Sequence, residues 1–254
     1  MNDYDRSWLK RYQRIAEELP IRRDLVAMLR YLQSNRVTGT QSLGNLPLKA
    51  VREITTKFVN PPVLDRDIGD RVYKLRSEDD VWSLVFLHAI AEAGELLMGG
   101  SSRLFRVTPM SDRFLSFSPF EQVKYMILAW WTRVNWLIAY PYESMGDELP
   151  RYFHFNTLES LLGVKDDKQV EFEPFAEKLI EETGLTWISE YTGSHRSHLL
   201  SSIEKMVIDV LSDFGVLNVG YREEMKYSYV FKKLHTFQIT GFGQDLLTMI
   251  YINF

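Results

Sequence analysis

The 254-residue chain contains no cysteine, and this absence excludes several kinds of chemistry at once. Disulfide bonds, thiolate metal sites and cysteine nucleophiles are all ruled out. A long apolar run is also missing: the most apolar segment, Tyr125 to Tyr140, is interrupted by Arg133 and Asn135 and is shorter than the ~20 residues of a membrane span. We therefore expect no membrane-spanning segment and a protein suited to a reducing compartment.

An excess of positive charge is lacking too. The chain has 30 Lys and Arg against 34 Asp and Glu, a net charge of -4, and a pI near 5.8. Binding to nucleic acid would therefore need a local basic patch. Residues 1–8 contain Asp3 and Asp5 but no apolar run, so we expect no signal peptide and a cytoplasmic location.

The stretch from Ser77 to Leu115 has the clearest pattern of secondary structure. A capping-box pattern at Ser77 predicts the start of a helix, and Gly94 predicts its end. A glycine-rich hairpin of two short strands is expected next, over residues 95–107. Thr108 followed by proline then predicts the cap and first turn of another helix. The order predicted is helix, hairpin, helix.

A similar pattern recurs in the second half when Gly94 is placed on Gly215 and Thr108 on Thr240. The positions that are apolar in both halves include Phe86 and Val207, Leu87 and Ile208, Ala89 and Val210, Ile90 and Leu211, and Leu96 and Leu217. The landmarks are 14 positions apart in the first half and 25 in the second. We therefore predict two units of one design, the second with a longer hairpin.

These residues resemble the winged-helix superfamily, in particular the domains beside helicases of the XPB type and in uncharacterised bacterial proteins. The resemblance is carried by Ala93 to Leu97, Leu104 to Thr108 and Phe114 with Leu115, and by Phe214 to Leu217, Phe237 to Thr240 and Leu246 with Leu247. It implies a three-helix bundle with a wing in each half. It also implies binding of duplex DNA through the third helix and the wing.

With this resemblance, we expect a mainly α protein with small β-hairpins (α+β), made of two winged-helix-like units joined by a long helix. The predicted parts are an N-terminal helix (1–20), a first unit (21–117), a connecting helix and linker (118–150), and a second unit with an extended wing (151–254). The connecting helix starts at a capping box at Ser118. Its broad apolar surface suggests burial between two bodies.

The charges place any DNA contact in the second unit. In the first unit, the third helix begins with Glu78, Asp79 and Asp80, and these carboxylates would repel phosphates. In the second unit, the corresponding helix start and the long wing carry basic and imidazole groups. The predicted nucleic-acid-binding residues are His195, Arg196, His198, Arg222, Lys226, Lys232 and Lys233.

Other site chemistries have simpler explanations. The Gly241-Phe242-Gly243 sequence lacks the further residues of a nucleotide-binding loop, and we interpret it as a turn. His195 and His198 could share a helix face as metal ligands, but no acidic third ligand accompanies them. His88 is interpreted as a hydrogen-bonded histidine at the edge of the core. We therefore expect no catalytic site, cofactor or metal.

Two hypotheses for function follow. The first, which we favour on sequence, is a non-enzymatic winged-helix protein associated with double-stranded DNA through its basic, aromatic second wing. The second is a protein-interaction module in which the same frame does not bind DNA, as indicated by the acidic first recognition helix and the negative net charge.

Overall fold

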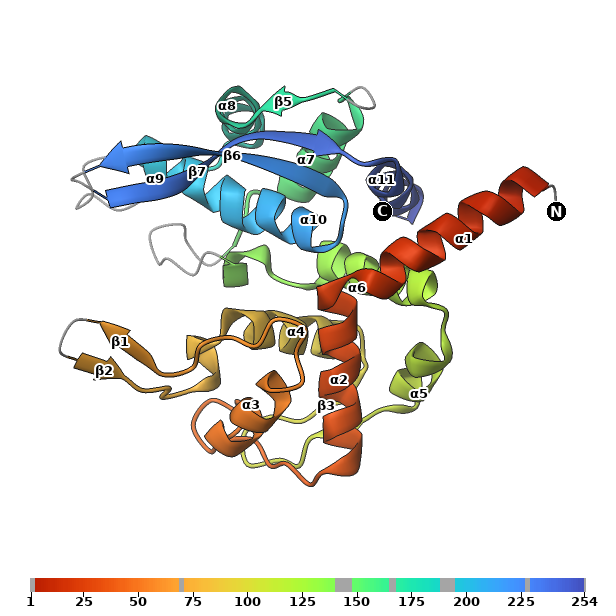
Figure 1. Cartoon of the computed structure of the whole chain (residues 1–254), viewed down its shortest axis with the longest axis vertical. Helices are drawn as coiled ribbons and strands as arrows, with labels where there is room; N and C mark the ends of the chain where they lie inside the picture. The colour runs from red at the N-terminus through yellow and green to blue at the C-terminus, as the bar shows by residue number, and fades with distance from the viewer. Residues whose placement is uncertain are drawn as a thin grey trace. The chain divides into compact units, whose positions relative to one another are not determined.

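The computed structural model describes residues 3–68, 71–139, 148–164, 168–187, 195–226 and 229–253. The chain forms two compact units, Met1–Val134 and Asn135–Phe254. The structure is mainly helical with small antiparallel sheets, which confirms the predicted α+β class (Figure 1). None of the described helices combines the length and apolarity needed to cross a membrane.

Helix α6 (Pro119–Arg133), which the sequence analysis placed in a connecting segment over 118–150, lies within the first compact unit. It packs against α1 (Asp3–Glu18) and against other helices of the same unit. Trp130 and Trp131 are both buried. The helix is apolar on several sides because helices of the same unit pack against several of its faces. The spacing of apolar residues shows that a face is buried, but it does not show which unit buries it.

The first unit follows the order helix, strand, helix, helix, two strands, helix. Its elements are α2 (Pro20–Ser34), α3 (Leu48–Thr55), α4 (Trp82–Ala93), β3 (Leu97–Met98), β4 (Arg106–Val107) and α5 (Pro109–Ser116). Between α2 and α3, Thr38 forms an antiparallel bridge with Leu104. Its neighbours extend this pairing, because the amide of Phe105 donates to the carbonyl of Val37 at 2.8 Å. The segment after α2 is therefore the outer strand beside β4.

The segment before α4 contains structure that the sequence analysis missed. Residues 63–76 are polar and lack a clear alternation, yet β1 (Arg66–Ile68) and β2 (Arg71–Tyr73) pair there as an antiparallel hairpin. The predicted single helix from Ser77 begins instead as a separate turn, η1 (Glu78–Asp80), which precedes α4. The predicted capping box at Ser77 is present on this turn.

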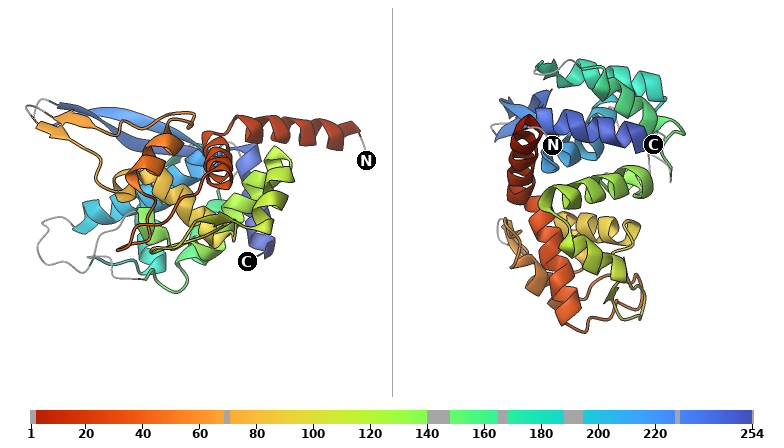
Figure 2. Two further views of the ribbon diagram at one scale, coloured as in Figure 1. Left: turned by 90° about the horizontal axis from the view of Figure 1, so that it is seen from below. Right: turned by 90° about the vertical axis from the view of Figure 1, so that its right-hand side faces the viewer.

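The second unit begins with η2 (Trp136–Ala139), followed by six helical elements and three strands among its described residues. These are α7 (Phe153–Leu162), β5 (Val170–Glu171), α8 (Phe172–Thr183), α9 (His195–Ile203), η4 (Glu204–Asp209), α10 (Val210–Asp213), β6 (Leu217–Lys226), β7 (Tyr229–Ile239) and α11 (Gly241–Asn253). The strands form one antiparallel sheet in the order β5-β7-β6. Figure 2 shows β6 and β7, in blue, as a long ribbon.

Alternating and helical apolar positions fill a separate core in each unit. In the first unit the fully or nearly fully buried side chains include Leu25, Met28, Leu29, Val51, Ile54, Leu84, Leu87, Ile90, Phe114, Val123 and Ile127. In the second they include Phe153, Leu158, Leu179, Ile203, Val207, Leu211, Leu217, Phe237, Ile239, Leu246 and Ile250. Burial of this apolar surface is the main force holding each unit together.

Part of the element order recurs in the two units, although β1 and β2 have no counterpart among the described elements of the second unit. In order along the chain, α2, α3, α4, β3 and β4 can be matched with α7, α8, the continuous helix α9-η4-α10, β6 and β7. In the second unit β5, between the first two helices, pairs with β7, whereas in the first unit the segment after α2 makes isolated bridges with residues that precede β4. The strands of the second hairpin span 10 and 11 residues, whereas those of the first span 2 each, so the predicted length difference is present.

The predicted glycine landmark is displaced by one residue. The residue with positive φ after α4 is Glu95, at 56°, whereas Gly94 has a φ of -81°. After α10 the corresponding residue is Gly215, at 71°. Matching hydrogen bonds run from the Leu96 amide to the Ala91 carbonyl at 2.7 Å and from the Val216 amide to the Leu211 carbonyl at 2.9 Å. Glu95, not Gly94, is therefore the counterpart of Gly215.

Gly94 is required for a different reason: a side chain at this position would clash with its neighbours, although its backbone φ is one that any residue can adopt. A Cβ atom on Gly94 would lie 2.9 Å from the Ile90 carbonyl oxygen and 3.1 Å from Cε1 of Tyr125 on α6. The Tyr125 hydroxyl also donates to the Gly94 carbonyl at 2.5 Å. The glycine therefore lets α6 approach the end of α4 closely, which explains why it stands one position before the left-handed residue.

These roles predict opposite effects for two substitutions at matched positions. We expect Glu95→Gly to raise the free energy of unfolding by roughly 1 kcal/mol, because it relieves a non-glycine left-handed residue, and Gly215→Ala to lower it by about 1–2 kcal/mol. Urea denaturation followed by circular dichroism measures both changes. Gly94→Ala is the control and should destabilise through contact with Tyr125. Equal stability of Gly215→Ala and the wild type would contradict this assignment.

Candidate functional site

The predicted nucleic-acid-binding residues lie on three elements of the second unit. His195, Arg196 and His198 stand in the first turn of α9, Arg222 lies on β6, and Lys232 and Lys233 lie on β7. Lys226 ends β6, but its side chain is outside the described part of the chain. The antiparallel register places Arg222 opposite Lys233 and Glu223 opposite Lys232. Helix α8 lies against β7 and contributes carboxylates to the same surface.

Lys233 is held by carboxylates. Its Nζ lies 2.5 Å from Oε1 of Glu173 on α8 and 3.8 Å from Oε1 of Glu224 on β6. The hydrogen bond from Lys233 is the main cause that lowers the pKa of the Glu173 carboxyl, and the bond from Glu173 likewise raises the pKa of Lys233. The positive charge of Lys233 is therefore already matched within the unit.

Arg196 is matched in the same way. Its Nε donates to Oε1 of Glu177 at 2.7 Å, its Nη2 contacts the same oxygen, and Nη2 also lies 4.0 Å from Oε2 of Glu173. The hydrogen bond to Glu177 is the main cause that raises the pKa of Arg196. These pairs are largely exposed, and each contributes little to stability. Their consequence is for binding, since a phosphate would have to compete with Glu173 and Glu177.

A polar cavity of about 360 Å³ lies over this network. It is lined by Glu171, Glu173, Pro174, Glu177, Arg222, Glu224, Lys233, Leu234 and His235. Four of these residues are glutamates, and only Arg222 and Lys233 carry a permanent positive charge. The cavity is therefore acidic on balance, and it lacks the run of unpaired cations that tracks a phosphate backbone.

The far end of the hairpin has a different character. Met225 pairs with Val230 across the strands, and their side chains are 79% and 60% exposed. Phe231, opposite Glu224, and Tyr221, opposite Leu234, are also exposed. Large apolar side chains here lie on a hairpin whose lysines and arginine are interleaved with glutamates.

The two histidines of α9 do not form a metal site with other described residues. The His198 ring stacks on Trp187 with ring centroids 4.5 Å apart and an angle of 12°, while His195 is exposed. Among the described residues, no group of three His, Asp or Glu side chains is placed to hold a metal ion. The stacking on Trp187 gives His198 a packing contact that the sequence did not reveal.

The acidic residues before α4 serve the local structure of the first unit. Asp79 accepts hydrogen bonds from the Asn45 side chain at 3.0 and 3.1 Å, and Asp80 accepts from the Arg76 amide at 2.7 Å. Glu78 is buried, with 2% of its surface exposed, and accepts from the Leu46 amide at 2.6 Å. Each carboxylate therefore satisfies donors of a loop or helix start.

His88 pairs with this buried glutamate. Its Nδ1 lies 2.7 Å from Oε1 of Glu78, and its Nε2 lies 3.5 Å from Oε1 of Glu92. Burial opposes the charged imidazolium, but the hydrogen bonds to Glu78 and Glu92 outweigh it and raise the pKa of His88 to about 9. The ring also packs edge-on against Phe105, with centroids 5.2 Å apart. The prediction of a hydrogen-bonded boundary histidine describes this residue well, although its charged state was not foreseen.

The raised pKa predicts how stability depends on pH. Because the folded pKa of about 9 exceeds the ordinary 6.5, the stabilisation by His88 is fully present below pH 6.5 and is lost as pH rises through 9. The loss is on the order of 3 kcal/mol. Hydrogen exchange of α4 in urea, measured between these pH values, tests it. His88→Gln should destabilise α4 at pH 6 and remove the pH dependence, and an unchanged dependence would contradict the pairing.

The site residues that sequence reasoning missed are the glutamates. Glu173 and Glu177 precede α9 in the chain and reach the hairpin only because β5 pairs with β7 and brings α8 alongside. The cluster of glutamates from Glu171 to Glu177 is visible in the sequence, but the pairing of β5 with β7 decides which basic side chains these glutamates contact.

The site is thus a set of ion pairs between α8, α9 and the hairpin, with exposed apolar residues at the hairpin's far end. No partner chemistry can be transferred to it from other proteins. Comparison of the chain with protein-family models, with curated proteins and with solved structures finds no match.

Proposed function

We propose that this chain is a non-enzymatic protein-interaction module built from two winged-helix-like units, and that the end of hairpin β6–β7 contacts a partner protein. The recurring part of the element order and, in the second unit, the pairing of β5 with β7 support the winged-helix frame. The observation that carries the function is the exposed cross-strand pair of Met225 and Val230, at the end of a hairpin on which Lys233 is already paired with Glu173 and Glu224.

The charge of the second unit favours a protein over a nucleic acid. Residues 135–254 contain 10 Lys and Arg against 18 Asp and Glu, a net charge of -8 with histidine neutral. Such a unit repels a polyanion, and Glu173, Glu177 and Glu224 lie beside the cations that would contact it. A partner surface with an apolar centre complements the end of this hairpin, because exposed apolar groups provide most binding energy when fully covered.

This proposal predicts that charge placed at the end of the hairpin abolishes partner capture. The tagged full chain and its Met225→Asp/Val230→Asp variant are used to recover proteins from native lysate, with quantitative mass spectrometry. We expect at least one protein to be enriched by the wild type and reduced about tenfold or more by the variant, since burying a charge in an apolar contact costs more than 1.4 kcal/mol.

The matched control is Val72→Asp/Met98→Asp, which changes two exposed apolar residues of the first unit. It should recover the same proteins as the wild type. If the hairpin variant and this control behave alike, or if recovery is abolished by nuclease, hairpin docking on a protein is wrong.

Association with double-stranded DNA is the second candidate function. It is favoured by the arrangement of the elements and by Arg222 and Lys232, which are exposed on the hairpin strands. If DNA binds there, Lys232→Glu/Lys233→Glu should weaken binding and lower the salt dependence by roughly 1.8 in slope, as two lost phosphate contacts require. A mobility-shift titration on duplex DNA measures this. The protein-docking proposal predicts no shift by the wild type even at low salt.

A further inference from the structure

The positive charge of this chain is concentrated in the first unit. Residues 1–134 contain 20 Lys and Arg against 16 Asp and Glu, a net charge of +4, although the whole chain carries -4. Within this unit, residues 20–64 contain seven Lys and Arg against two Asp and Glu, a net charge of +5. These residues include α2 and α3, so the positive balance of the unit originates at these two helices.

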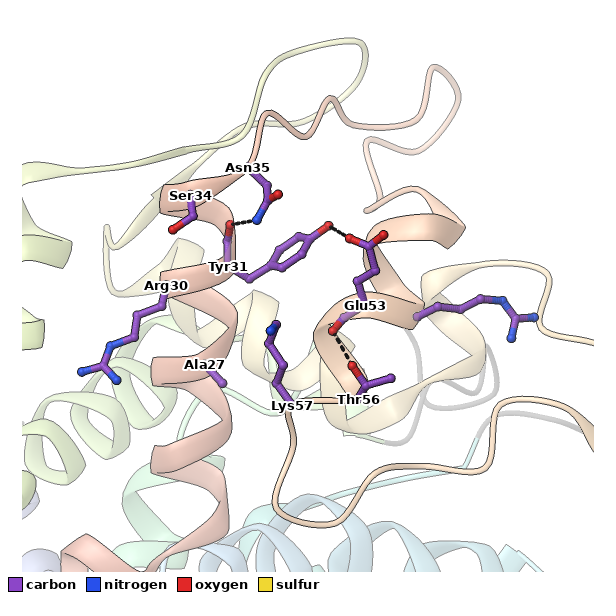
Figure 3. A pocket seen from close by; sticks show the side chains of 9 residues that line it. Ala27, Arg30, Tyr31, Ser34, Asn35, Glu53, Thr56 and Lys57 are labelled. Carbon is purple, nitrogen blue, oxygen red and sulfur yellow. Dashed lines mark hydrogen bonds between the residues drawn. The ribbon is translucent and has the colours of Figure 1, made fainter.

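A groove of about 800 Å³ runs between α2 and α3, and we call it the α2–α3 groove. It is lined by Ala27, Arg30, Tyr31, Ser34, Asn35, Arg52, Glu53, Thr56 and Lys57 (Figure 3). The spacing of Ala27, Arg30 and Ser34 places them on one face of α2, which borders the groove. Its volume lies within the range of roughly 300–1,000 Å³ that is usual for ligand sites.

One hydrogen bond crosses the α2–α3 groove. The Tyr31 hydroxyl on α2 donates to Oε2 of Glu53 on α3 at 2.6 Å, as Figure 3 shows. Burial and this bond raise the pKa of Tyr31 to about 12, so the hydroxyl stays a donor. Oε1 of Glu53 also lies 3.9 Å from Nζ of Lys49.

Two of the cations that line the groove are available to a ligand. Arg52 is held by two hydrogen bonds to Asp65, at 3.0 and 3.1 Å. Arg30 and Lys57 have no ion-pair partner among the described residues, and both side chains are exposed. Figure 3 shows Lys57 extending between the helices toward Tyr31, while the Arg30 guanidinium extends outward from α2, away from Glu53. Lys57 therefore places positive charge between the helices, and Arg30 places it at the outer border of the groove.

We propose that the α2–α3 groove binds an acidic segment of a partner protein. Carboxylates of such a segment would pair with Lys57 and Arg30, and its backbone or hydroxyl groups would meet the side chains of Ser34 and Asn35 at one end of the groove. A peptide fits better than a DNA backbone, because Glu53 lies in the groove and can accept a hydrogen bond from a peptide amide, a donor that the sugar-phosphate backbone of DNA does not have.

The groove belongs to the first unit, and the inference does not depend on docking by hairpin β6–β7. A fluorescein-labelled decapeptide of alternating Glu and Ser is titrated with the full chain, and fluorescence anisotropy reports binding. The wild type should bind the peptide, more weakly at higher salt, and should not bind the same peptide with Gln in place of Glu. Arg30→Glu/Lys57→Glu should weaken binding by about tenfold, because two attractive contacts become repulsive.

The matched control is Lys10→Glu/Arg113→Glu, which makes the same change in net charge at exposed residues of this unit outside the groove. It should bind the acidic peptide within about twofold of the wild type. Equal weakening by both double variants would show only a general charge effect and would overturn the proposal. It would also be overturned if the wild type bound no acidic peptide at low salt, or bound a duplex oligonucleotide of equal charge more tightly.

Discussion

A single threonine in each unit joins the helix, the hairpin and the following helix, and the rest of the unit depends on this junction. Thr108 donates from its hydroxyl to the Glu95 carbonyl at 2.6 Å and from its amide to the Leu96 carbonyl at 3.1 Å, while its hydroxyl caps α5. Thr240 donates likewise to the carbonyls of Gly215, at 2.8 Å, and Val216, at 2.9 Å, and its hydroxyl accepts from the Gly243 amide at 2.8 Å. Because the first strand of each hairpin begins at this clamp and the second ends there, the strand register is set at the base of the hairpin, and the far end is free to differ in length.

That freedom explains why the two hairpins have such different surfaces. The strands β3 and β4 span only two residues each beside the clamp, so the paired strands of the first hairpin do not extend beyond the base of the hairpin. The strands β6 and β7 continue past the point where β5 and α8 cover them, and residues beyond Leu234 toward the hairpin's end gain solvent on both faces. Lys233, about midway along β7, is within reach of Glu173 on α8, whereas Met225 at the end of the hairpin is 79% exposed. Position along the hairpin therefore decides which side chains form contacts within the unit and which are exposed to solvent, where a partner could bind them.

The features that sequence patterns predicted are those set by local chemistry. The capping roles of Thr108 and Ser118, the hairpins and the helical core positions follow from spacing and turn residues, and the structure has them. The displaced landmark at Glu95 could not be predicted, because glycine is also selected for close helix packing, as at Gly94. The pairing of Arg196 and Lys233 with glutamates of α8 depends on strand order, which composition does not encode. The α2–α3 groove was missed because the net charge of the whole chain conceals a basic unit beside an acidic one.

This division of charge limits which ligands the two units can share. A polyanion that is attracted by a net charge of +4 on the first unit is repelled by -8 on the second, and at physiological salt each unit acts mainly over a Debye length of about 8 Å. For a single long polyanion that contacts both units, repulsion by the second unit would therefore offset the favourable electrostatic binding free energy provided by the first. The two ligand chemistries that we propose, one acidic at the α2–α3 groove and one apolar at the end of hairpin β6–β7, avoid this conflict. Opposite charge on the two units thus fits a chain that connects two dissimilar partners better than one that follows a nucleic-acid backbone.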